Sequence, residues 1–169
     1  PLYAGGLWLG GRVGGILRVA VAEFSSEYWP GPMSGGTYLS NADLNPVHRV
    51  YKLYADSGEF NPNQDYDEWP DEFGAPTTPE GAPLILGDQT LWAVFNDANL
   101  DRHIVSSGLT LTLGIEAQVM MWASDDPSQA NVIHVMHKLF NKGGNTITDF
   151  HVGVWMDPDI GFASDDLVG

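Results

Sequence analysis

The sequence predicts an all-β fold: an antiparallel β-sandwich of the jelly-roll or immunoglobulin-like kind, with long acidic loops rich in proline and glycine. Short runs of alternating or apolar residues recur along the chain, and turn-forming residues separate them. The 169 residues include 20 glycines and 11 prolines, which fits many turns between short strands. No internal repeat and no amphipathic helix of convincing length interrupts this pattern. Short strands joined by turns favour a sandwich or a barrel.

The N-terminal half begins with a predicted β-hairpin. Residues 2–11 and 16–24 are rich in large apolar side chains, and Val13-Gly14-Gly15 supplies the turn between them. Both faces of the second arm are mostly apolar, so we expect it to lie between two layers. Residues 47–54 alternate and predict a further strand. The acidic, proline-rich stretch 56–83 is predicted to be a long loop.

The C-terminal half carries the stronger strand signal. Residues 90–96 predict one strand, and residues 109–123 predict either one bent strand or two strands that meet at Gly114. Residues 131–140 and 146–156 are predicted to pair as a hairpin through a glycine-rich turn. We expect all of these strands to belong to a single domain.

Composition excludes several classes of partner. The formal net charge is -15, with 22 acidic residues against seven Lys and Arg, which is the wrong sign for binding nucleic acid or an anionic membrane. The absence of cysteine removes disulfides and zinc–thiolate sites. No apolar run approaches 18 residues, so no membrane insertion is expected. The start at Pro1 and the acidic end suggest that residues 1–169 are a fragment of a longer exported chain.

The acidic loop that ends the sequence is the first candidate metal site. Calcium takes six to eight oxygen ligands, and closely spaced aspartates supply them. The predicted ligands of this loop are Asp157, Asp159, Asp165 and Asp166. Repulsion among neighbouring carboxylates favours a counter-ion here. The alternative is a solvated turn in which the carboxylates cap backbone amides.

A second acidic loop follows the predicted strand 90–96. Asp97, Asn99 and Asp101 have the D-x-N-x-D spacing that places alternate oxygen-bearing side chains around one cation. The alternative is an Asx-turn that caps a short helix. If both acidic loops lie at the same end of the fold, they could share one calcium ion.

Two further patterns suggest other functions. Trp29 and Trp69 are each followed by proline in a predicted loop, so they are candidates for stacking on sugar rings. The alternative is that their loops fold back onto the domain. Glu23, Glu27 and Glu116 are available as paired carboxylates for glycoside hydrolysis. Among 22 acidic residues such pairs also arise by chance.

Four strings of residues give the chain a family resemblance. They are GLWLGG at 6–11, RVAVAE at 18–23, GDQTLWAVFNDA at 87–98 and WMDPDIG at 155–161. Together they resemble an N-terminal region of large secreted bacterial proteins that often end in a type IX secretion sorting domain. The resemblance implies export, a cell-surface or extracellular location and a longer parent chain. Asn99 stands where the resemblance leads us to expect Asp, which weakens that loop as a ligand set.

The function predicted from these observations is non-enzymatic. We expect a calcium-stabilised module of an extracellular or cell-surface bacterial protein, with a filament or layer subunit as its specific form. Exposed apolar or glycine-rich strands near the N-terminus would suit strand pairing with another copy or another surface protein. The alternatives are a carbohydrate-binding module that uses Trp29 and Trp69, and a hydrolase domain that uses acidic loop residues.

Overall fold

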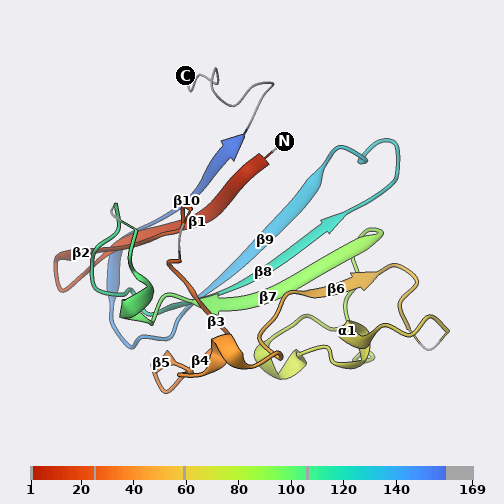
Figure 1. Cartoon of the computed structure of the whole chain (residues 1–169), viewed down its shortest axis with the longest axis horizontal. Coiled ribbons are helices and arrows are strands. Elements are labelled where there is room, and N and C mark those ends of the chain that lie inside the picture. The colour runs from red at the N-terminus through yellow and green to blue at the C-terminus, as the bar shows by residue number, and fades with distance from the viewer. Residues whose placement is uncertain (1, 25, 59, 106, 159–169) are drawn as a thin grey trace.

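The structure, a computed structural model, describes residues 2–24, 26–58, 60–105 and 107–158, and it confirms an all-β fold with antiparallel pairing (Figure 1). One sheet has the order β10-β1-β2, and a second has the order β3-β7-β8-β9, with β6 paired to β7. A small hairpin, β4-β5, stands apart. The strands of the two larger sheets are β1 (Leu2–Val13), β2 (Ile16–Val21), β3 (Trp29–Pro30), β6 (Tyr51–Tyr54), β7 (Gln89–Asn96), β8 (Ile115–Ala123), β9 (Ile133–Asn141) and β10 (Ile147–Pro158).

The smaller elements lie in the segments between these strands. They are the strands β4 (Met33–Ser34) and β5 (Thr37–Tyr38), the helix α1 (Gln64–Asp67) and the 3-10 turns η1 (Ala42–Leu44), η2 (Asp71–Phe73) and η3 (Leu100–Arg102). Among the described residues, no helix is long and apolar enough to span a bilayer.

The predicted N-terminal hairpin is confirmed. Strands β1 and β2 pair from Trp8 with Val21 to Val13 with Ile16. Gly14 and Gly15 join them with φ angles of 58° and 82°, a turn that residues with a Cβ adopt at a cost. However, β1 also pairs with β10 along its other edge, so it lies in the middle of its sheet. The N-terminal strand is therefore not the free edge that we expected.

The predicted hairpin between residues 131–140 and 146–156 is wrong. Strand β9 pairs with β8 over its full nine residues, whereas β10 pairs with β1 in the other sheet. The segment between them crosses from one sheet to the other, and there Gly143 packs against Gly114 so closely that a Cβ on either would clash. Gly114 has a φ of 81° and directly precedes β8. Residues 109–114 form no strand, so only residues 115–123 of the predicted stretch 109–123 are a strand.

Two hydrophobic cores hold the fold together. One lies between the two larger sheets and joins Leu7, Leu9 and Ala20 to Leu113, Ile115 and Ala117. The other lies on the opposite face of the five-stranded sheet, where the segment 56–88 covers Tyr51, Leu53, Trp92 and Met120. The long acidic stretch is thus a cover packed on a sheet, and Arg49 anchors it by ion pairs to Asp65 (2.7 Å) and Glu68 (2.8 Å).

The two larger sheets pack together through the core of Leu7, Leu9, Ala20, Leu113, Ile115 and Ala117. Figure 1 shows β1 and β10 running out from the region shared with β7, β8 and β9 and diverging from them. The core between the sheets lies near the common end. Further out, the facing sides of the sheets are separated by an open cleft.

Candidate functional site

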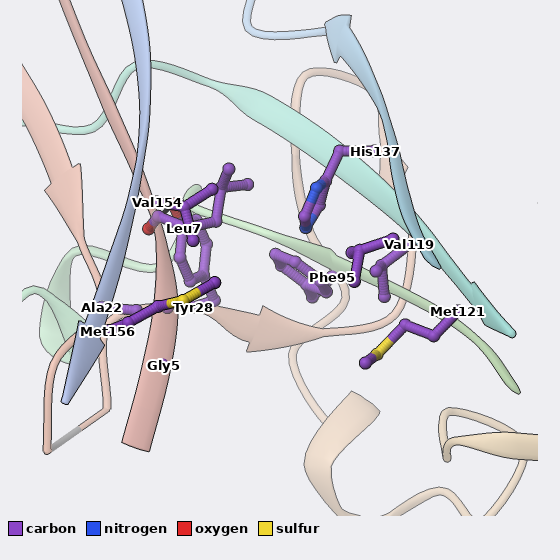
Figure 2. Close-up of a pocket in the computed structure, with 12 residues that line it drawn as sticks. Gly5, Leu7, Ala22, Tyr28, Phe95, Val119, Met121, His137, Val154 and Met156 are labelled. Carbon is purple, nitrogen blue, oxygen red and sulfur yellow. Dashed lines mark hydrogen bonds between the residues drawn. The ribbon is translucent and has the colours of Figure 1, made fainter. Parts of the chain in front are cut away.

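An apolar cleft lies between the diverging sheets. Its volume is about 450 Å³, and one wall comes from the three-stranded sheet while the other comes from the five-stranded sheet (Figure 2). Leu7, Val154 and Met156 point into it from β1 and β10. Its other wall consists of Phe95, Val119, Met121, Val135 and His137. The lining is almost entirely aliphatic and aromatic, so the cleft is suited to apolar side chains.

The alternation of side chains in β-strands positions this lining. Residues two apart on a strand point to the same face, so Val152, Val154 and Met156 share one face of β10. Leu7 lies opposite Val154 in the pairing of β1 with β10, which places both on the cleft side. Strand β7 alternates in the same way, and Phe95 on its cleft side is less buried than Val94 on its core side.

The cleft leaves large apolar side chains in contact with solvent. Val135 is 48% exposed, Val154 is 59% exposed and Met156 is 60% exposed. Val152 and Ile133 extend the exposed apolar surface along β10 and β9. Contiguous exposed apolar surface of this kind marks interaction sites more often than isolated exposed residues do.

The strands that carry this surface are also edge strands. Within the described part of the chain, β9 pairs only with β8, and β10 pairs only with β1. Their lengths are nine and twelve residues. Each therefore presents a row of backbone N–H and C=O groups that another strand can pair with.

The polar groups of the cleft do not form a catalytic arrangement. Burial lowers the pKa of His137, so this imidazole is neutral at pH 7. Tyr28 donates its hydroxyl hydrogen to the carbonyl oxygen of Leu7 at 3.0 Å, and burial raises the pKa of this phenol above its ordinary value. These two groups supply neither a nucleophile nor a base with an orienting partner.

The acidic loop after β7 forms backbone hydrogen bonds and an Asx-turn, and its role as a calcium site stays a prediction. Asp97 is fully buried, and its two oxygens accept hydrogen bonds from the backbone amides of Leu113 (2.5 Å) and Ile115 (2.6 Å). Asn99 accepts from the amide of Asp101 at 3.1 Å, which is an Asx-turn. The Asp97 carboxylate thus binds the backbone at the start of β8.

The terminal acidic loop is only partly described. Asp157 lies near the end of β10, opposite Ala4 of β1. Asp159, Asp165 and Asp166 lie outside the described residues, so their role as calcium ligands stays a prediction. Within the described ranges, no three His, Cys, Asp or Glu side chains are grouped closely enough to hold a metal ion.

Both candidate sugar-stacking tryptophans have buried rings. Trp69 is 8% exposed and packs in the core beside Tyr51 and Trp92. Trp29 is 5% exposed, and the guanidinium of Arg102 lies 4.9 Å from the centre of its ring. Both loops fold back onto the domain, which is the alternative expected from the sequence, and both rings are largely covered.

Trp29, Asn99 and Asp101 come together around one polar pocket. Its volume is about 430 Å³, and Tyr38 and Arg102 complete its main walls. The sequence placed Trp29 and the two polar residues at separate sites. Their meeting depends on the pairing of β3 with β7, which brings residue 29 beside residue 96.

Two of the three carboxylates considered for hydrolysis have structural roles, whereas Glu23 is partly exposed and accepts a hydrogen bond from Ser107 at 2.7 Å. The Oε2 atom of Glu116 accepts from Lys142 at 2.6 Å and from the amide of Met33 at 2.7 Å, and the Glu116 side chain is fully buried. Glu27 is also buried, and it accepts from the amide of Val21 at 3.0 Å. Both are inside the fold, where a substrate cannot reach them.

A buried Glu27–His103 pair was not evident from the sequence. The Nδ1 atom of His103 lies 3.5 Å from the Oε1 atom of Glu27, and its Nε2 atom lies 2.9 Å from the carbonyl oxygen of Asp97. That carbonyl needs a donor, so Nε2 carries hydrogen and Nδ1 faces the carboxyl group. Burial raises the pKa of Glu27, which favours the protonated, uncharged form of this carboxyl group inside the fold.

Comparison with known proteins gave no match: no family model, no curated protein and no solved structure is significantly similar to the chain.

Proposed function

We propose that the chain is a non-enzymatic assembly module of an extracellular or cell-surface protein, which joins its neighbour through the apolar cleft and the free edges of β9 and β10. The observation that carries this proposal is the coincidence of exposed apolar side chains with unpaired strand edges on the same two strands. Strand addition uses both features at once, because backbone hydrogen bonds supply affinity and alternate side chains fill pockets.

The energetics favour burial of this surface. Complete burial of a Val or Met side chain contributes about 1.5–3 kcal/mol. Val135, Val154 and Met156 are each about half exposed. Covering the exposed part of these three side chains therefore gains roughly 2.5–5 kcal/mol before backbone pairing is added. Pairing along β9 or β10 also satisfies groups that water alone now solvates.

In this proposal the two larger sheets are halves of a sandwich whose open end is completed by strands of the neighbouring molecule. Sheets in a sandwich pack face to face about 10 Å apart with interdigitating side chains. Here the facing sides already interdigitate at the core of Leu7, Leu9 and Ile115. The cleft continues the same apolar faces outward.

Two parts of the proposal, the extracellular setting and the calcium site, are supported by the sequence alone. The resemblance of the four strings implies export, and the aspartates from Asp157 onward supply oxygen ligands. Binding of calcium to the folded chain alone would stabilise it without any contact to the cleft. The calcium site and the assembly are therefore separable by experiment.

Sedimentation velocity over a concentration series tests the assembly. We expect the mass of the full chain to rise with concentration, and the double variant Val135→Asp/Val154→Lys to remain a monomer. Leu44→Lys is the matched control, since Leu44 is 80% exposed but lies on η1, away from both edges. A wild-type chain that stays monomeric at every concentration would refute the assembly function.

A further inference from the structure

The two free edges carry opposite charge. Strand β9 reads IHVMHKLFN, with Lys138 as its one Lys or Arg and no carboxylate, in a chain whose net charge is -15. Strand β10 reads ITDFHVGVWMDP, with Asp149 and Asp157 and neither Lys nor Arg; Asp149 lies 3.7 Å from Arg12 of β1, which leaves Asp157 as the carboxylate of β10 without an ion pair among the described residues. The edges are therefore complementary to each other but not to themselves.

Resting on the proposed assembly function, we infer that β9 of one copy pairs with β10 of the next. Pairing β10 with β10 would bring four aspartates into one strand pair, and like charges across a strand pair are destabilising. Pairing β9 with β9 would bring two copies of Lys138 together. Only the β9–β10 combination sets the strand of Lys138 beside the strand of Asp157.

The side-chain faces support the same combination. Lys138 lies three residues after Val135, and Asp157 lies three residues after Val154. Residues three apart on a strand point to opposite faces. When the apolar faces of the two strands are aligned on the cleft side, Lys138 and Asp157 both lie on the other face, where their charges attract.

The register of β10 is regular in this region. Its pairing with β1 is continuous from Ala4 opposite Asp157 to Gly10 opposite His151, and the irregularity of β10 lies beyond, next to Asp149. Val152, Val154 and Met156 therefore present an uninterrupted apolar face to a partner strand.

A contact between two different edges leaves one edge of each kind free at the ends of the assembly. Such heterologous contacts repeat, and they build open chains unless the geometry closes a ring. The partner of this surface is thus a second copy of this chain, and the product is a filament.

Complementary edge variants test the pairing. Val135→Asp damages β9 and leaves β10 intact, whereas Val154→Lys damages β10 and leaves β9 intact. Each variant alone is expected to associate at least tenfold more weakly than the wild type. An equimolar mixture is expected to form a 1:1 complex, with affinity within a few-fold of the wild type, and to grow no further because both remaining edges are damaged.

Other outcomes overturn the pairing. If Val154→Lys alone still self-associates while Val135→Asp does not, the contact is β9 with β9; the reverse result indicates β10 with β10. A wild type that stops at the dimer contradicts the filament, and a wild type that never associates defeats the proposed function itself. Ile133→Asp on β9 and Val152→Lys on β10 are a second pair of edge variants. Both positions are exposed, so these variants can be used for the same test if the first pair fails to fold.

Discussion

Asp97 provides the sharpest test of how the fold is held together. Its carboxylate is fully buried and accepts the backbone amides of Leu113 and Ile115. Asp97→Ala leaves both donors without an acceptor. A buried donor that loses its partner costs about 1–3 kcal/mol, so two donors cost roughly 2–6 kcal/mol.

A second effect partly offsets this loss. Burial raises the pKa of Asp97, which means that the fold bears a penalty for holding this carboxylate ionised. The variant removes that penalty. We therefore expect Asp97→Ala to lower the free energy of unfolding by about 2–5 kcal/mol. Asp97→Asn keeps one acceptor oxygen and is expected to cost less.

Urea unfolding followed by tryptophan fluorescence measures this change. Asp101→Ala is the matched control, because Asp101 belongs to the same acidic loop but is exposed. Its expected effect is within about 0.5 kcal/mol. Equal effects of Asp97→Ala and Asp101→Ala would refute this role of the Asp97 carboxylate. A loss at Asp97 that appears only with calcium and vanishes with chelator would make Asp97 a metal ligand.

Four further predictions follow from the same structure. Trp69→Ala is expected to lower the unfolding free energy by about 3–5 kcal/mol through the cavity it leaves, measured by urea unfolding; a surface-like loss under about 0.5 kcal/mol would contradict its place in the core. Gly114→Ala should lower the melting temperature, since its φ is 81° and a Cβ would lie 2.5 Å from the Cα of Gly143; an unchanged temperature would contradict this close crossing. Because burial raises the pKa of Glu27 above 4.5, its protonation stabilises the fold fully below about pH 4.5, and this contribution is lost as pH rises through the raised value. As the pH is lowered toward 4.5, Glu27→Gln should therefore gain less stability than the wild type in urea titrations, and an equal gain would remove Glu27 as the titrating group. Calcium at a hundredfold excess over its Kd should raise stability by about 2.7 kcal/mol, and Asp157→Ala should abolish the rise while Asp101→Ala keeps it; no rise in the wild type would leave the terminal aspartates as turn residues.

Local features of the fold were predictable from the sequence. Gly14 and Gly15 adopt the positive φ angles that the hairpin turn requires, and that signal is confined to neighbouring residues. The alternation of strand β7 was equally visible, and its burial alternates residue by residue. These features need no information about distant segments.

Pairings between distant segments were not predictable. A glycine-rich turn between two strands has the same local pattern whether the strands pair with each other or cross between sheets. The partner of β10 is β1, at the far end of the sequence, and nothing in residues 141–146 indicates this choice. The sequence predicted that residues of β9 and β10 form strands with apolar side chains. It did not predict that these side chains are exposed, because that depends on how the two sheets diverge.

The candidate sites illustrate the same limit. The D-x-N-x-D pattern at residues 97–101 fits a cation loop and an Asx-turn equally well. The structure adds that the amides of Leu113 and Ile115 donate to Asp97, a contact that residue types do not encode. Trp69 lies in an acidic loop, where the sequence gives no sign of burial. Its burial follows from the packing of this loop on the five-stranded sheet.

The most direct test of the central claim is hydrogen–deuterium exchange of the full chain at low and high protein concentration. Pairing of the free edges predicts that amides of β9 and β10 become protected as concentration rises, while those of the edge strands β2 and β6 exchange at an unchanged rate. Protection confined to β2 or β6, or no concentration dependence along β9 and β10, would contradict assembly through the cleft.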